Sequence, residues 1–130
     1  MATGLAAATA NAWLDALCRS VAYTDPVAFY VKLHIGDPGA AGAGSPAGET
    51  TRKQATFSAA SGGAITTSAD LTWTNVSTSE TYSHVSFWDA AAAGTFLGSD
   101  ALNASRAVIA GDTFTIVAGD IDIDITAIAA

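Results

Sequence analysis

The sequence predicts a mainly β fold, an antiparallel β-sandwich or small barrel, with one N-terminal α-helix. Between Phe29 and Ile35 apolar residues alternate with other residues, as in a half-buried strand. Beyond it, short apolar stretches are separated by turn residues at intervals of about ten, which is typical of all-β domains. The 130 residues suit a single domain, 1–130, with a helical segment over 1–25 and the β-sandwich over 26–130.

The helix is predicted from about Ala8 to Ser20, because large apolar residues fall on one side of this segment. This apolar stripe consists of Trp13, Leu14, Leu17, Cys18 and Val21. Such a helix either closes its own domain or docks on a partner, and the first arrangement is the commoner. On the stripe, Cys18 is expected to be a buried, unreactive thiol.

The first strand is the segment FYVKLHI, in which Phe29, Val31, Leu33 and Ile35 face one way. Tyr30, Lys32 and His34 are expected on the opposite, outward face. The loop over residues 40–50 consists of small residues and offers no obvious core side chain. We expect this loop to be either mobile or held by a neighbouring subunit.

The rest of the chain is predicted to form short strands between glycine-containing turns. These strands are expected at Arg52–Ser58, Gly63–Thr67, Leu71–Asn75, Ser83–Asp89, Thr95–Ser99, Thr113–Val117 and Ile121–Thr126. Among their aromatic residues, Trp73 and Trp88 are expected in the core.

The charge balance disfavours several classes of partner. Twelve acidic residues stand against five basic ones, for a formal net charge of −7. Nucleic acids and anionic membrane surfaces both require clustered Lys and Arg, so we expect neither as a partner. No apolar run reaches the roughly 18 residues of a membrane-spanning helix.

No set of residues predicts catalysis, and we expect no catalytic residue, no cofactor and no enzymatic activity. His34 and His84 lie within strand patterns, without a neighbouring nucleophile motif. The glycine-rich stretch before Pro46 lacks the G-K-[ST] ending of a phosphate-binding loop and leads into a strand.

The segment GDIDIDIT, Gly119–Thr126, is where carboxylates gather most densely. A straight strand would place Asp120, Asp122 and Asp124 roughly 7 Å apart on one face, too far apart to surround one ion. A metal site would therefore need ligands from elsewhere. The favoured interpretation is a strand with its aspartates in solvent and its three isoleucines, Ile121, Ile123 and Ile125, packed inward.

Three stretches carry a resemblance to a known family. They are FYVKLHIGDPGAAGAG, YSHVSFWDAAAAGTFLGSDAL and GDTFTIVAGDIDIDI, in this order between Phe29 and Ile125. In combination they resemble small virion structural proteins of tailed bacteriophages, described as minor tail, tail-fibre or capsid-associated proteins. The resemblance implies a virion component made in the host cytoplasm, and it implies no cofactor.

The leading functional hypothesis is a capsid decoration or minor capsid protein that assembles as a homotrimer on the particle surface. The alternatives are a tail-associated protein and a host-surface carbohydrate-binding module that uses Tyr30, Tyr82, Trp88 and Asp89. The expected partners are copies of the chain itself and major capsid or tail proteins. The interface candidates are Trp13, Leu14, Leu17, Tyr30, Tyr82 and Trp88.

Overall fold

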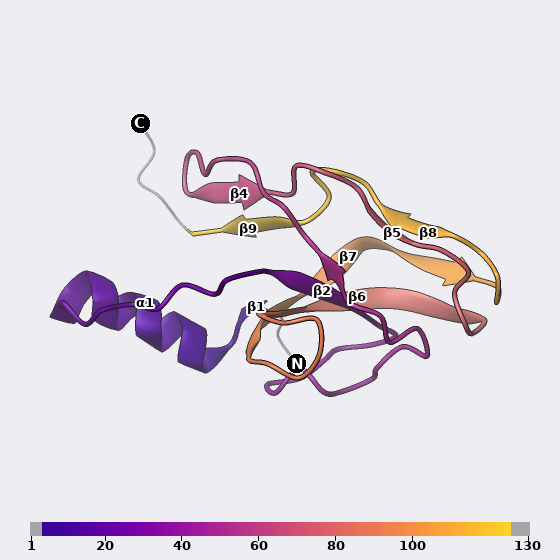
Figure 1. Ribbon diagram of the computed structural model, residues 1–130, viewed down its shortest axis with the longest axis horizontal. Helices are drawn as coiled ribbons and strands as arrows, with labels where there is room; N and C mark the ends of the chain where they lie inside the picture. The colour runs from indigo at the N-terminus through magenta and orange to yellow at the C-terminus, as the bar shows by residue number, and fades with distance from the viewer. Residues whose placement is uncertain (1–3, 126–130) are drawn as a thin grey trace.

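The chain folds into one five-stranded antiparallel sheet, two short two-stranded sheets and one projecting helix (Figure 1). The computed structural model describes residues 4–125. Its elements are β1 (Gly4–Leu5), α1 (Ala7–Arg19), β2 (Tyr30–His34), β3 (Lys53–Gln54), β4 (Ala64–Thr66), β5 (Leu71–Trp73), β6 (Glu80–Trp88), β7 (Phe96–Val108), β8 (Phe114–Ile116) and β9 (Asp122–Asp124).

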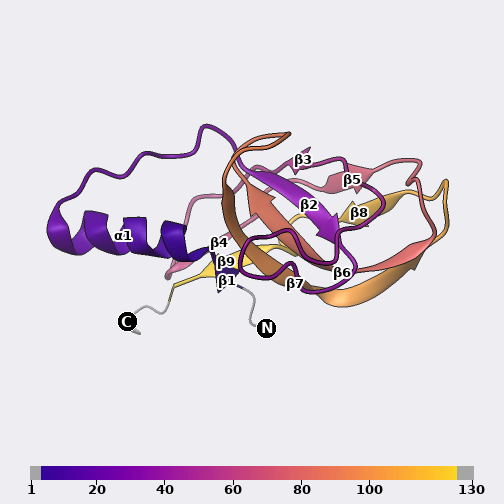
Figure 2. The same cartoon turned by 90° about the horizontal axis from the view of Figure 1, so that it is seen from below.

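The large sheet has the strand order β1-β7-β6-β2-β3. Strands β4 and β9 form one of the short sheets, and β5 and β8 form the other. Figures 1 and 2 show these two short pairs lying over the large sheet as a second layer. Every pairing is antiparallel, and no sheet closes into a barrel over residues 4–125. The predicted fold class is therefore confirmed, whereas the domain bounds 1–130 stay a prediction.

The core lies between the two layers and is centred on three aromatic rings. Phe114 of β8 contacts both Trp73 and Tyr82, with ring centroids 5.9 and 5.0 Å apart. Val31 and Leu33 of β2 are fully buried beneath them, as the period-two pattern predicts. The Trp73 indole Nε1 donates a 2.7 Å hydrogen bond to the carbonyl oxygen of Thr51, which satisfies its one polar atom inside this core.

Most strands differ in length from their predictions: β3, β4, β5 and β8 are shorter than predicted, and β6 begins at Glu80 instead of Ser83. β7 was expected at Thr95–Ser99 but continues to Val108, and its added part is mostly exposed. Its pairing with β6 passes a bulge, where β6 advances two residues, from Tyr82 to His84, while β7 advances five. At the other end of the chain, β9 covers only the middle of the predicted Ile121–Thr126 strand, and Thr126 lies outside the described residues.

The prediction that His34 faces outward is wrong, because polar partners hold this side chain inside. Its Nδ1 lies 2.7 Å from the carbonyl oxygen of Gly44, and its Nε2 lies 2.7 Å from Ser86 Oγ. A carbonyl oxygen only accepts, so Nδ1 carries the proton and Nε2 accepts from the Ser86 hydroxyl. The Trp88 indole Nε1 donates to the same hydroxyl oxygen at 2.7 Å. Burial lowers the pKa of His34 and so favours this neutral ring.

The loop over residues 40–50 does supply a core side chain, contrary to expectation. Ala47 is buried in the main core cluster. Beside it, the carboxylate of Glu80 accepts hydrogen bonds from the backbone N–H of Gly48 at 2.9 and 3.0 Å and of Glu49 at 3.3 Å. The small side chains of this loop bury little apolar surface. Backbone hydrogen bonds to Glu80 therefore hold the loop in position.

Candidate interaction surfaces

The apolar stripe of α1 is exposed along most of its length. Leu14 is 58% exposed and Leu17 is 81% exposed, and Cys18 beside them is exposed too. The prediction of a buried Cys18 is therefore wrong. We call Leu14, Leu17 and Cys18 the helix ridge. An apolar ridge in contact with water is a feature of interaction surfaces.

The ridge is exposed because α1 contacts the sheets through its first half and through Trp13, on a side of the helix that the ridge does not share. The Ala6 N–H donates a 2.9 Å hydrogen bond to the Leu97 carbonyl of β7, and Thr9 is buried beside it. From there the helix extends away from the sheets, and the chain returns alongside it toward β2 (Figure 2). On the return, Tyr23 meets Trp13 edge to face, with ring centroids 6.3 Å apart, and leaves the opposite side of the helix uncovered.

An apolar pocket of about 230 Å³ lies where α1 meets the sheets. Its lining includes Leu5, Trp13, Tyr23, Pro26, Phe29 and Ile123. Trp13 thus contributes to this inner wall, whereas Leu14 and Leu17 point to solvent. Of the three predicted interface candidates on the helix, Trp13 therefore faces the pocket, whereas Leu14 and Leu17 face solvent.

The proposed carbohydrate site does not assemble. Tyr82 is fully buried against Phe114, so its ring offers no face to a sugar, and its assignment as an interface residue is wrong. Trp88 is half-buried and is not part of the core cluster, contrary to the prediction. The Arg52 guanidinium lies 4.2 Å from its ring centroid and covers one face of the ring. Tyr30 lies opposite Trp88 across β2 and β6 and is half-buried as well.

Arg52 is a structural residue that the sequence analysis missed. Its Nη1 donates to the carbonyl oxygens of Ala90 and Ala93, at 2.9 and 2.7 Å, and so holds the hairpin between β6 and β7 against Trp88. Asp89 begins this hairpin, and its Oδ1 accepts a 2.7 Å hydrogen bond from the Thr95 N–H. Asp89 therefore acts in the turn.

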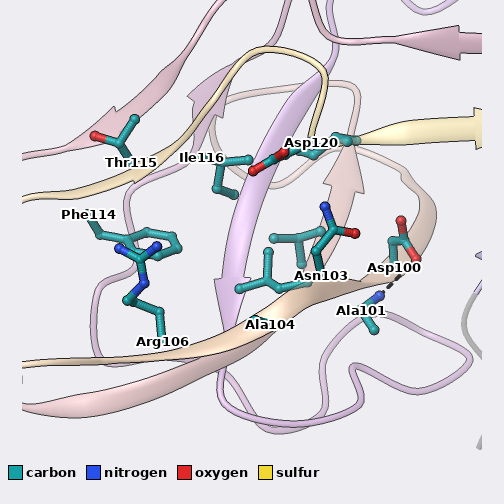
Figure 3. A pocket seen from close by; sticks show the side chains of 12 residues that line it. Asp100, Ala101, Asn103, Ala104, Arg106, Phe114, Thr115, Ile116 and Asp120 are labelled. Atoms are coloured by element: carbon teal, nitrogen blue, oxygen red, sulfur yellow. Dashed lines mark hydrogen bonds between the residues drawn. The ribbon is translucent and has the colours of Figure 1, made fainter.

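A second pocket, of about 130 Å³, lies between β7 and the chain around β8 (Figure 3). Asp100, Asn103 and Asp120 project from its rim, and the Arg106 guanidinium lies over the Phe114 ring, 6.0 Å from its centroid. Burial raises the pKa of Asp100, and the charges of Asp122 and Asp124 raise it further. The volume is below the roughly 300 Å³ at which small-molecule sites begin.

The aspartates of GDIDIDIT do lie in solvent. Asp122 and Asp124 are exposed on β9, and Asp120 is exposed in the turn before it. Ile121 is buried and Ile123 half-buried as expected, whereas Ile125 is 59% exposed because it follows the end of the strand. Across the described residues, no three His, Cys, Asp or Glu side chains gather as a metal site would require.

Within the described part of the chain, α1 is too short to cross a membrane, and no other helix is present there to do so. The helix ridge and the two pockets are therefore surface features of a β-rich body. Arg52 supports that body by holding the hairpin between β6 and β7.

Comparison with known families decides the identity. The family model described as "Podophage GP4 fiber I protein gp80" matches residues 4–124. The chain belongs to this fiber I family. The predicted resemblance to small tailed-phage structural proteins is therefore confirmed. A comparison with curated proteins gives no significant match.

Membership of the fiber I family makes the chain a virion structural protein of a bacteriophage. The family description does not support capsid decoration, the hypothesis that the sequence analysis put first. It favours the tail-associated alternative, since the family is named for a fibre.

Proposed function

We propose that this protein is a non-enzymatic structural component of a podophage tail, part of a fibre, and that it works by assembly with its own copies and with other tail proteins. The observation that carries the proposal is the fiber I family match across residues 4–124. It covers both the sheets and α1, so the proposal concerns the whole described fold.

The form of the molecule supports assembly as its mode of action. The β-rich body is held by buried aromatic contacts and by hydrogen bonds such as that from Trp73 to Thr51. The helix carries its exposed apolar residues away from that body. A rigid body with one protruding apolar element suits a subunit that is joined to neighbours.

The test is to locate the protein on the particle. An epitope tag placed at the exposed hairpin residue Ala91 would be labelled with gold and viewed by electron microscopy of intact phage. We expect label on the tail. Label spread over the head would contradict the proposal and would restore the capsid hypothesis.

A matched control separates location from accessibility. The same tag would be inserted beside Gly62, in another exposed turn on a different part of the surface. Label from either position on the tail supports the proposal, and absence of the protein from purified particles by mass spectrometry contradicts it.

A further inference from the structure

We propose that the protein binds a single sugar in a two-part pocket beside the beginning of α1, with Thr9 at its centre. One part is the apolar pocket of about 230 Å³ described above. The other part has a volume of about 250 Å³ and reaches the 89–95 hairpin. A ligand of this kind goes beyond assembly into a tail, and its binding does not depend on where the protein lies on the particle.

The two parts of this pocket adjoin, and we call them together the Thr9 site. The residues that line both parts are Thr9, Tyr23, Asp25, Pro26 and Leu97. Each part alone is smaller than the roughly 300 Å³ at which small-molecule sites begin, but the two together exceed this volume. The Thr9 site shares only Asp89 with the carbohydrate site predicted from the sequence, which does not assemble.

Thr9 is the residue that points to a ligand. It is 8% exposed, yet it lines both parts of the pocket. Its hydroxyl has no hydrogen-bond partner within residues 4–125. Buried polar groups in folded proteins are almost always hydrogen-bonded, so an unpartnered hydroxyl at a pocket wall indicates a position for a polar group of a ligand.

The charges around Thr9 favour an uncharged ligand. Asp25 is exposed to solvent, and Asp89 interacts electrostatically with the Arg52 guanidinium, so neither carboxylate leaves a strong negative field in the pocket. The beginning of α1 contributes the positive end of the helix dipole, which neither a side-chain cap nor an acidic residue of the first turn offsets. Little net charge therefore remains to select an ammonium or a phosphate group.

Hydroxyl groups match the hydrogen-bonding groups of the Thr9 site. The carboxylates of Asp25 and Asp89 only accept hydrogen bonds, whereas the Thr9 hydroxyl both donates and accepts. Asp89 uses Oδ1 for the Thr95 N–H at 2.7 Å and keeps Oδ2 for a ligand. A ligand with several adjacent hydroxyls, each a donor and an acceptor, satisfies the three side chains at once.

The apolar part of the site specifies the kind of sugar. Its walls include Trp13, Tyr23, Phe29 and Leu97, which suit the C–H side of a sugar ring and a methyl group. The methyl group of an N-acetyl or 6-deoxy sugar would lie there, while the ring hydroxyls reach Thr9. A sugar with such a methyl group should therefore bind more tightly than one without it.

A peptide is a poorer occupant of the Thr9 site. Extended peptides often bind by pairing with a free strand edge. The edge of β7 at this pocket is already used, because the Ala6 N–H donates to the Leu97 carbonyl and β1 pairs with Gly98 and Ser99.

The first experiment is an NMR titration of the isotope-labelled full chain with methyl glycosides of single sugars. The probes are glucose, galactose, rhamnose, fucose, N-acetylglucosamine and N-acetylgalactosamine, each up to about 50 mM, because so small a ligand is expected to bind with a Kd of about 1–10 mM. We expect saturable shifts of the amides at residues 8–12, 23–26 and 89–97 with at least one methyl-bearing sugar. No saturable shift with any probe would mean that the pocket holds solvent only, and it would overturn the proposal.

Removal of the Thr9 hydroxyl tests its role. Thr9→Val keeps the shape of the side chain and is expected to raise the Kd about three- to tenfold. Thr72→Val is the matched control, since Thr72 is exposed on β5 and lines neither part of the pocket. Circular dichroism would verify that both variants fold. Equal Kd values for the two variants would overturn the proposal.

A second pair of variants leaves the buried residues intact. Asp25→Ala removes an exposed hydrogen-bond acceptor of the site and should raise the Kd at least about threefold. Asp122→Ala, which removes an exposed carboxylate on β9, should leave the Kd unchanged. If Asp25→Ala binds as tightly as Asp122→Ala, the assignment of the site is wrong.

Further probes test the class of ligand. Inorganic phosphate and methylammonium would be titrated under the same conditions, and saturable binding of either at the Thr9 site with a lower Kd than every sugar would overturn the proposal. N-acetylglucosamine should bind at least about threefold more tightly than glucose, because its methyl group is buried in the apolar part. Equal or weaker binding of N-acetylglucosamine, rhamnose and fucose would contradict the two-part site.

Discussion

His34 and Ser86 share a buried 2.7 Å hydrogen bond that joins the last residue of β2 to β6, two residues before the end of that strand. The same imidazole bonds to Gly44, and the same hydroxyl accepts from Trp88. One chain of hydrogen bonds therefore runs from the glycine-rich loop through the sheet to the half-buried Trp88. The chain requires a neutral His34, because Nε2 must accept.

Acid should weaken the fold through His34. Burial lowers its pKa below 6.5, and the charges of Lys32 and His84 lower it further, while hydrogen bonds to Gly44 and Ser45 oppose the shift. Below about pH 6.5 the His34 ring therefore binds a proton in the unfolded chain but not in the folded chain, so the free energy of unfolding falls. Urea denaturation at about pH 7.5 and about pH 5.5 would measure the loss. It should shrink in His34→Gln and persist in His84→Gln; an unchanged loss in His34→Gln would contradict the assignment.

Alkali should weaken the fold through Tyr82. Burial raises the pKa of its hydroxyl to about 12, helped by the charges of Glu80 and Glu49. Above about pH 10 the unfolded chain loses this proton while the folded chain keeps it, so the free energy of unfolding falls as the pH rises from about 10 to about 12. Guanidinium denaturation across this range would show the fall. Tyr82→Phe should reduce it relative to Tyr23→Phe, and equal slopes would refute the role of Tyr82.

Gly42 and Gly39 form a matched pair in the loop after β2. Both have left-handed φ, +72° and +75°, but a Cβ on Gly42 would collide with the Phe96 ring, whereas a Cβ on Gly39 would meet nothing within 4 Å. Gly39→Ala should therefore cost only backbone strain, about 1 kcal/mol. Gly42→Ala should cost about 1–3 kcal/mol more. Thermal denaturation of both variants tests this order, and equal losses would show that the Phe96 contact is unimportant.

Arg52 should not be replaceable by lysine. Its planar guanidinium stacks on Trp88 while it donates to two hairpin carbonyls, and a lysine ammonium cannot do both. We expect Arg52→Lys to lower the free energy of unfolding by about 1–2 kcal/mol. Amide hydrogen exchange should accelerate in the 89–95 hairpin, whereas Lys53→Arg, one residue along, should leave it unchanged. Equal exchange rates in the two variants would refute this role of Arg52.

The sequence predicted those strands whose side chains alternate between core and solvent. β2, β5 and β8 follow the period-two pattern, so their positions were found closely. The second half of β7, ending at Val108, was missed because its small and polar residues face solvent on both sides. Such a strand forms because it pairs with β6, and a local sequence pattern does not reveal that pairing.

The same limit applies to the interaction surfaces. The apolar stripe of α1 was found, but periodicity tells which side of a helix is apolar and not whether another element covers it. His34 was misplaced for a related reason. Its burial depends on Ser86, 52 residues away in the sequence, and on the carbonyl of Gly44. The family resemblance rested on three segments in combination, and no single segment was specific enough to show it.

The bulge between β6 and β7 bears on aggregation. An open, regular strand edge invites another chain to add by backbone pairing, and this is how fibrillar aggregates grow. Five residues of β7 against two of β6 break that regularity along the longest strand of the described fold. This irregularity makes β7 a poor template for backbone pairing with another chain, so the exposed part of the sheet resists growth into a fibril.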